Sequence, residues 1–98
     1  MSKELQKIIN KLTSLKPILK QNYFVKEIGI FGSYVKNQQH KNSDIDILIE
    51  FTDDIDIFTV ADLINMLSSI FNKKVDVVNK KTLRENISKS ILSEVKYV

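Results

Sequence analysis

The run from Asp44 to Phe51 constrains the fold more than any other stretch of the chain. It alternates between an apolar set and a set led by carboxylates: Ile45, Ile47 and Ile49 against Asp44, Asp46, Leu48 and Glu50. Because successive side chains of a β-strand point to opposite faces, this alternation predicts a strand. One face of the strand is expected to be buried, and the other presents two carboxylates that point the same way.

Two further apolar runs also predict strands. Residues 25–31 form a β-branched and aromatic run that stops at Gly32-Ser33, and residues 74–78 form a valine-rich run interrupted by Asp76. Between the first two runs, residues 34–43 have almost no apolar content. This segment predicts one helical turn after Ser33, followed by an exposed loop.

Helical spacing dominates the N-terminal part of the chain. The apolar positions that follow it are Leu5, Ile8, Ile9, Leu12 and Leu15. Ser2 is suited to cap this helix. Because Pro17 lacks an amide hydrogen and crowds the preceding turn, we expect a break near residues 15–16 and a second helical piece over 17–22. A single bent helix is the alternative.

Two more helices are expected in the second half of the chain. The first covers residues 57–72, with Asp56 or Asp54 as its N-cap. Its apolar positions form a broad stripe, which predicts the best-buried helix of the chain: Val60, Leu63, Ile64, Leu67, Ile70 and Phe71. The second covers residues 81–95.

The order of these elements predicts an α+β fold in a single domain, residues 1–98. Its centre is a small mixed β-sheet, with strands near 25–31, 44–51 and 74–78, covered by helices. Gly32-Ser33 lies at the exit of the first strand and Asp44 at the entry of the second, so the two meet only if these strands are antiparallel. The helix over residues 57–72 then returns the chain, so that the third strand can run parallel to the second.

Composition excludes several classes of protein. The net charge of +3, from 15 basic and 12 acidic residues, is too small and too dispersed to indicate direct nucleic-acid binding. The chain has no cysteine, which excludes disulfides and zinc-thiolate sites. No run approaches the ~18 apolar residues of a membrane span, and the charged N-terminus does not resemble a signal peptide. We therefore expect a cytoplasmic protein.

Three carboxylates suggest a metal site. Asp44 and Asp46 share one strand face, and Asp76 interrupts a run that is expected to lie beside them. Clustered carboxylates repel one another unless a cation is present, and Mg²⁺ prefers such oxygens together with phosphate. Two Mg²⁺ ions would stabilise the attacking and leaving oxygens of a phosphoryl displacement. Asp76 could also take the proton from an attacking hydroxyl.

The turn at Gly32-Ser33 is the expected phosphate site. Glycine leaves the backbone bare, so that a phosphate can approach the amides, and Ser33 adds a hydroxyl donor. Lys36 and Lys41, in the following polar loop, could add positive charge near a triphosphate.

Each of these features has an ordinary structural explanation when taken alone. Gly-Ser is common at turns, Asp-x-Asp is common in caps, and Asp76 could pair with Lys73 or Lys74. Their conjunction is the specific signal.

That conjunction resembles the minimal nucleotidyltransferase (MNT) family of the DNA polymerase β-like nucleotidyltransferase superfamily. The matching segments are residues 31–34, 43–48 and 74–78, and the likeness extends over nearly the whole chain. Where the family usually has Ala-Arg-Gly after Gly-Ser-Tyr, this chain has Val35-Lys36-Asn37, so a single ammonium replaces arginine's bidentate grip on phosphate.

The resemblance implies a polymerase β-like fold and a role for each candidate residue. Gly32 and Ser33 would bind the nucleotide phosphates, Asp44 and Asp46 would bind Mg²⁺, and Asp76 would complete the triad. Small members of the family resemble antitoxins that transfer AMP from ATP to a tyrosine hydroxyl of a partner HEPN ribonuclease toxin and release pyrophosphate.

Two other functions stay open at this point. The chain could be a non-catalytic binding module that neutralises the toxin by forming a complex. It could also modify a small molecule, although that activity needs an acceptor-binding second domain, which 98 residues cannot supply unless a dimer provides it.

Overall fold

The structure, a computed structural model, describes residues 2–83 and 85–98. Its elements in chain order are α1 (Lys3–Tyr23), β1 (Val25–Phe31), the 3₁₀ turn η1 (Gly32–Tyr34), β2 (Ile45–Phe51), α2 (Ile57–Phe71), β3 (Val75–Asn79), the 3₁₀ turn η2 (Lys80–Thr82), α3 (Glu85–Glu94) and β4 (Lys96–Tyr97).

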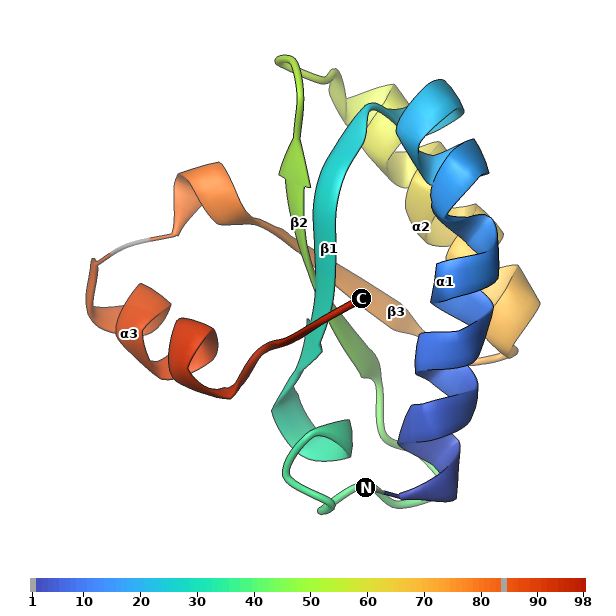
Figure 1. The fold of residues 1–98 in the computed structure, drawn as a ribbon, viewed down its shortest axis with the longest axis vertical. Coiled ribbons are helices and arrows are strands. Elements are labelled where there is room, and N and C mark those ends of the chain that lie inside the picture. The colour runs from blue at the N-terminus through green and yellow to red at the C-terminus, as the bar shows by residue number, and fades with distance from the viewer. Residues whose placement is uncertain (1, 84) are drawn as a thin grey trace.

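The four strands form one mixed sheet in the order β3-β2-β1-β4. β1 is antiparallel to both β2 and β4, and β2 is parallel to β3. Figure 1 shows α1 and α2 on one side of the sheet and α3 on the other side. The predicted α+β fold, its three main strands and their relative directions are therefore confirmed.

The apolar core lies between the sheet and the α1–α2 layer. The isoleucines at positions 45, 47 and 49 are fully buried there, as the alternation in β2 predicts. They pack in one cluster with buried leucines of both helices. Asp46 and Glu50, which alternate with them, are held on the opposite face by the same packing.

The predicted break in the N-terminal helix is wrong. α1 continues through Pro17 to Tyr23, so the single-helix alternative holds. Pro17 lies on the exposed side, while a buried leucine and isoleucine stripe runs past it to Leu19. Burial along this stripe stabilises the turns on both sides of the proline and offsets one missing backbone hydrogen bond. As predicted, the Ser2 hydroxyl accepts from the Leu5 N–H, at 3.1 Å.

The expectation that residues 57–72 form the best-buried helix is also wrong. Only Leu63 and Leu67 of α2 are buried, against five residues of α1, because the first turn of α2 projects into solvent. Ile57 in that turn is 76% exposed. The Asp56 cap forms as predicted, with Oδ1 accepting from the Thr59 N–H at 2.9 Å.

The C-terminal segment is more divided than the predicted helix over 81–95. It contains η2, the shorter helix α3 and the two-residue strand β4, which is too short to leave a sequence pattern. No helix within residues 2–83 and 85–98 combines the length and the apolar character that crossing a membrane would need.

Replacing Leu67 by alanine should lower the free energy of unfolding by about 2–5 kcal/mol, because the cavity would lie in the core between α2 and the sheet. The matched control in the same helix is Ile57→Ala, which should change it by about 0.5 kcal/mol or less. Urea denaturation followed by circular dichroism measures both. Equal losses would contradict the placement of the core.

Candidate active site

Two of the three predicted carboxylates lie side by side in the sheet. Asp46 of β2 is paired in register with Asp76 of β3. Because neighbouring strands lie ~4.8 Å apart and paired side chains point to the same face, these carboxylates are near neighbours. Asp44 lies just before β2, two residues from Asp46. The face that carries them is the one opposite the apolar core.

The charges of these groups act on one another. Burial raises the pKa of the Asp46 carboxyl above its ordinary value of 3.8, and the negative charge of Asp76 raises it further. Asp44 and then Glu94 add smaller contributions in the same direction. Negative charge on Asp46 is therefore unfavourable, and a bound cation would relieve the repulsion.

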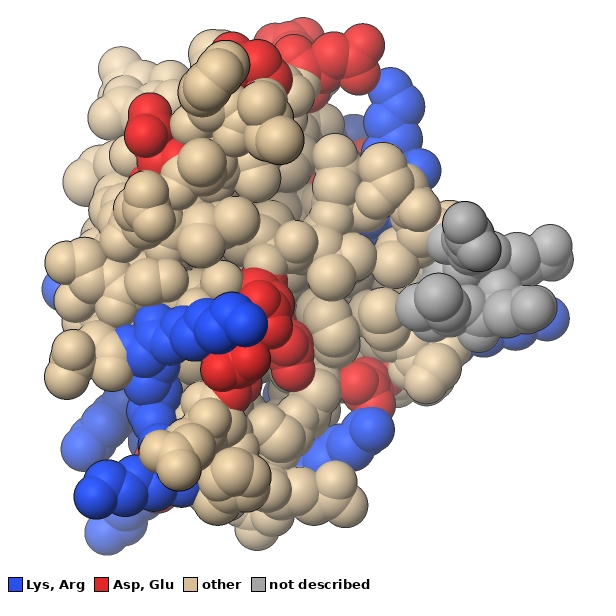
Figure 2. All heavy atoms as spheres, turned by 180° about the vertical axis from the view of Figure 1, so that it is seen from behind, with Lys and Arg blue, Asp and Glu red and all other residues tan. Residues whose placement is uncertain are grey.

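A lysine stands between the other two carboxylates. The Nζ atom of Lys74 lies 3.8 Å from Asp44 Oδ2 and 4.0 Å from Asp76 Oδ1. The alternative pairing of Asp76 with Lys74 therefore occurs, and it places both aspartates around one ammonium group. In Figure 2, acidic and basic side chains meet in the same way near the middle of the face seen from behind.

The donor set fits Mg²⁺, although it does not form a ready-made cage. Within the part of the chain that the structure describes, no three acidic or histidine side chains are gathered tightly enough to enclose a metal ion. Mg²⁺ commonly uses one or two protein carboxylates and takes its other ligands from water and substrate phosphates. The adjacent Asp46 and Asp76, with Asp44 close by, meet that requirement.

Gly32 lies directly against Asp46. Its φ of +79° belongs to the left-handed region, and a Cβ built there would overlap Asp46 Oδ2. Both the backbone conformation and the close approach therefore require glycine. Ser33 follows in η1, and its carbonyl accepts from the Gln38 N–H at 2.8 Å, which holds the turn. The structure thus brings the predicted phosphate turn and Asp46 into contact.

The sequence pattern did not predict one residue of the site, Glu94. Glu94, the last residue of α3, accepts a hydrogen bond from the Gly32 N–H through Oε1 at 2.9 Å. Its Oε2 lies 3.3 Å from Lys36 Nζ. No local pattern could have revealed this contact, because Glu94 and Gly32 are 62 positions apart.

Lysines line a small pocket of about 260 Å³ beside Asp44: Lys41, Lys73 and Lys74. The Lys73 ammonium donates to the Lys41 carbonyl at 3.0 Å, which ties the polar loop to the start of β3. Lys41 therefore lies on the side of Asp44, whereas Lys36 lies on the side of Gly32. The two predicted phosphate-binding lysines flank the carboxylates.

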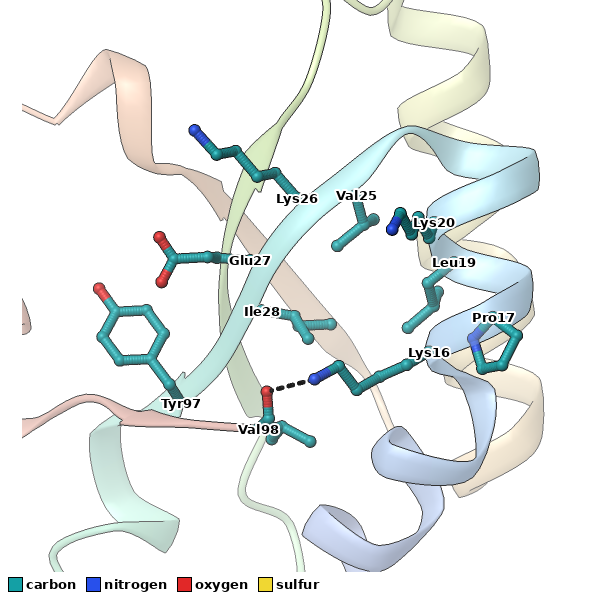
Figure 3. Close-up of a pocket in the computed structure, with 10 residues that line it drawn as sticks. All are labelled: Lys16, Pro17, Leu19, Lys20, Val25, Lys26, Glu27, Ile28, Tyr97 and Val98. Carbon is teal, nitrogen blue, oxygen red and sulfur yellow. Dashed lines mark hydrogen bonds between the residues drawn. The ribbon is translucent and has the colours of Figure 1, made fainter.

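A more apolar pocket of about 460 Å³ lies elsewhere, between α1, β1 and the C-terminal residues. Figure 3 shows its floor of apolar side chains and the hydrogen bond from Lys16 Nζ to the Val98 carbonyl, 3.1 Å long. None of the predicted site residues lines it. A larger pocket of about 640 Å³, at the loop after β2, contains none of the predicted site residues either. Pocket volume therefore does not identify the carboxylate site.

Comparisons with known proteins agree with this geometry. Residues 12–98 match the nucleotidyltransferase domain family. Protein adenylyltransferase MntA of Thermococcus cleftensis is 37% identical over 94 residues, which cover 96% of this chain and 95% of that protein. A solved toxin–antitoxin structure with AMP-PNP matches with a TM-score of 0.75 at 30% identity, covering 90% of this chain and 69% of that one. A second, of the tri-AMPylated Shewanella oneidensis HEPN toxin in complex with MNT antitoxin, matches with a TM-score of 0.70 at 26% identity, covering 95% and 70%.

Gly32→Ala should destabilise the fold by about 1–3 kcal/mol, since a side chain at this φ is strained and would push Asp46 aside. Asn37→Gly is the matched control, because Asn37 also has a positive φ, of 57°, and glycine there relieves strain. In urea unfolding, the free energy of unfolding should fall for Gly32→Ala and should rise or stay unchanged for Asn37→Gly. A Gly32→Ala protein of unchanged stability would disprove the predicted clash.

Asp46→Asn should raise the melting temperature at pH 7 in the presence of a chelator, on the order of 1–4 °C after allowance for solvent screening. The raised pKa means that folding favours the neutral carboxyl, so the stability that Asp46 contributes in acid is lost as the pH rises through the folded-state pKa. The advantage of the variant should therefore disappear below about pH 3.8. Asp53→Asn, at an exposed loop position, is the control. A lower melting temperature for Asp46→Asn at pH 7 would refute the predicted repulsion.

Proposed function

This chain belongs to the nucleotidyltransferase domain family, and on that premise we propose that it is an antitoxin that AMPylates its toxin. It would transfer AMP from ATP to a hydroxyl, most simply of a tyrosine, on a cognate HEPN ribonuclease toxin. The observation that carries the proposal is the in-register pair of Asp46 and Asp76 against the bare turn at Gly32. The similarity to an adenylyltransferase and to the complex that holds an AMPylated toxin supports the choice of donor and partner.

The activity would reside in one domain, residues 1–98, because α1, the sheet and α2 share one apolar core. The protein would act in the cytoplasm, where ATP and the RNA substrates of a ribonuclease are found. The partners are the toxin and a nucleoside triphosphate.

The proposed ligands of Mg²⁺, as two ions, are Asp44, Asp46 and Asp76. When bound, Mg²⁺ supplies charge stabilisation to the attacking and leaving oxygens. Lys74 must then give up its position between Asp44 and Asp76, where it now balances their charge. Gly32, Ser33 and Lys36 are the proposed contacts of the nucleotide phosphates.

The reaction places few chemical demands on the protein. The acceptor hydroxyl oxygen forms a bond to the α-phosphorus of ATP, the bond from that phosphorus to the β-phosphate bridging oxygen breaks, and pyrophosphate leaves. Asp76, 46% exposed at its side chain, is available to take the hydroxyl proton. Positioning by the turn and the carboxylates accounts for the rest.

The test mixes the protein, its genomic neighbour toxin, labelled ATP and Mg²⁺, and follows label transfer and toxin mass. Asp76→Asn should lower the transfer rate by about 10²–10⁴-fold, as for loss of a general base, and Asp44→Ala should abolish detectable transfer. Asp53→Asn serves as the control of equal charge change. Absence of transfer by the wild type, under conditions in which it binds the toxin, would reject the proposal.

The alternative is a binding module that neutralises the toxin by complex formation. Similarity to chains from toxin–antitoxin complexes is also consistent with this alternative. Toxin rescue in cells decides between the two: if Asp44→Ala still neutralises the toxin as well as the wild type, occlusion is sufficient and the chemistry is secondary.

A further inference from the structure

Glu94 is an internal anion held at the turn where the nucleotide phosphates are expected. Each of its carboxylate oxygens has its own donor, the Gly32 N–H at 2.9 Å and the Lys36 ammonium at 3.3 Å. The side chain is only 18% exposed, so this arrangement is a formed contact and not a passing surface pair. Gly32 and Lys36 are also two of the three groups assigned above to phosphate.

We propose that Glu94 occupies a phosphate position of the nucleotide site and that a nucleotide binds only by displacing it. The inference rests on the proposed function for the identity of the ligand, a nucleoside triphosphate. Glu94 is thereby a determinant of nucleotide affinity, a role that follows from its place in this structure.

Electrostatics make joint occupancy unfavourable. A carboxylate and a phosphate use the same kinds of donor, backbone N–H and lysine ammonium, and both carry negative charge. If Glu94 stayed in place, a phosphate would meet one occupied amide, a shared lysine and a third anion beside Asp46 and Asp76.

The fold allows the displacement without unfolding. The backbone after Glu94 is fixed, because Val95 packs on Gly29 and Tyr97 pairs with it in the sheet. A Cβ at Gly29 would lie 2.7 Å from Val95 Cγ2, so the segment lies tight against β1. The step is therefore a rotation of the Glu94 side chain about its own bonds, away from the turn, while α3 and β4 keep their places.

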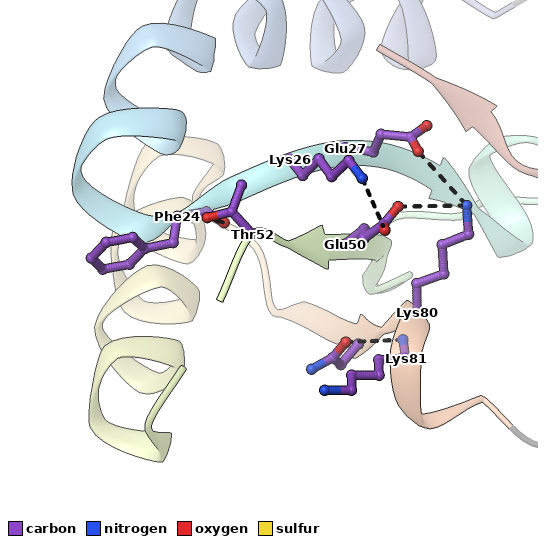
Figure 4. Close-up of polar contacts among 8 residues, drawn as sticks. Phe24, Lys26, Glu27, Glu50, Thr52, Lys80 and Lys81 are labelled. Carbon is purple, nitrogen blue, oxygen red and sulfur yellow. Dashed lines mark hydrogen bonds and ion pairs between the residues drawn. The ribbon is translucent and has the colours of Figure 1, made fainter. Parts of the chain in front are cut away.

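The experiment measures binding of ATP, with Mg²⁺, and of pyrophosphate by isothermal titration calorimetry. Glu94→Gln should bind ATP about tenfold more tightly than the wild type, equivalent to about 1.4 kcal/mol. Glu27→Gln is the matched control. Glu27 lies in β1, the strand that leads into the turn. Its carboxylate is 3.8 Å from the Lys80 ammonium, which also lies 3.9 Å from Glu50 (Figure 4). The Glu27→Gln variant loses the same charge, but the substituted residue does not touch Gly32 or Lys36. The ATP affinity of this variant should therefore stay at the wild-type value.

A measurement on the wild type keeps the test independent of how the variant folds. In NMR spectra, ATP or pyrophosphate should shift the Glu94 side-chain carboxyl resonance together with the Gly32 amide. A shift at Gly32 with none at Glu94 would show that the carboxylate stays, and would overturn the inference.

The outcomes separate this inference from the proposed function. If the wild type binds ATP and Glu94→Gln binds it equally or less tightly, Glu94 positions the turn and only the inference fails. If no variant binds ATP but Glu94→Gln gains affinity for pyrophosphate, the displaced-anion site stands and the nucleotide function fails. Absence of binding of either ligand by every variant overturns both.

Discussion

Repulsion among carboxylates held at fixed spacing is the constraint that shapes the candidate site. The sheet register leaves Asp46 and Asp76 no freedom to separate, and burial on the α1–α2 side prevents the strands from sliding. Neighbouring ammonium groups offset part of this repulsion. Lys74 forms ion pairs with Asp44 and Asp76, and Lys36 forms one with Glu94. Within the described residues no lysine pairs with Asp46, and burial together with the negative charge of Asp76 raises the pKa of its carboxyl. A cluster of this kind is suited to a divalent cation and a polyphosphate, which bring opposite charges to it together.

Local alternation explains how much of the fold could be predicted. The period of two in residues 44–51 determined both the buried face and the carboxylate face, and the single acid in residues 74–78 placed Asp76 on a neighbouring strand. The caps at Ser2 and Asp56 depend on contacts three residues apart, so they too were within reach of sequence reasoning. Strand directions followed from the need to bring Gly32 and Asp44 to the same end of the sheet.

The features that could not be predicted depend on contacts between distant residues. The helix through Pro17 persists because its buried stripe packs on the sheet, an energy that no local rule at proline contains. β4 pairs closely with β1 where Gly29 leaves room for Val95. Glu94 reaches the Gly32 turn from 62 positions away, so no local pattern could indicate the contact. Lys36 stands where the resemblance leads us to expect arginine. Its ammonium is a point charge, and the single carboxylate of Glu94 can neutralise it.

In β2 the side chains that hold the protein together and those that face the site take turns along a single strand. A one-residue slip would exchange the two sets, so correct pairing is enforced by the isoleucines and owes nothing to the acids. The isoleucine face of β2 therefore packs in the main core, whereas the opposite face carries the site carboxylates beside the buried Leu48. A descendant of this chain that lost Asp46 and Asp76 would therefore keep its fold and any association that depends on the fold.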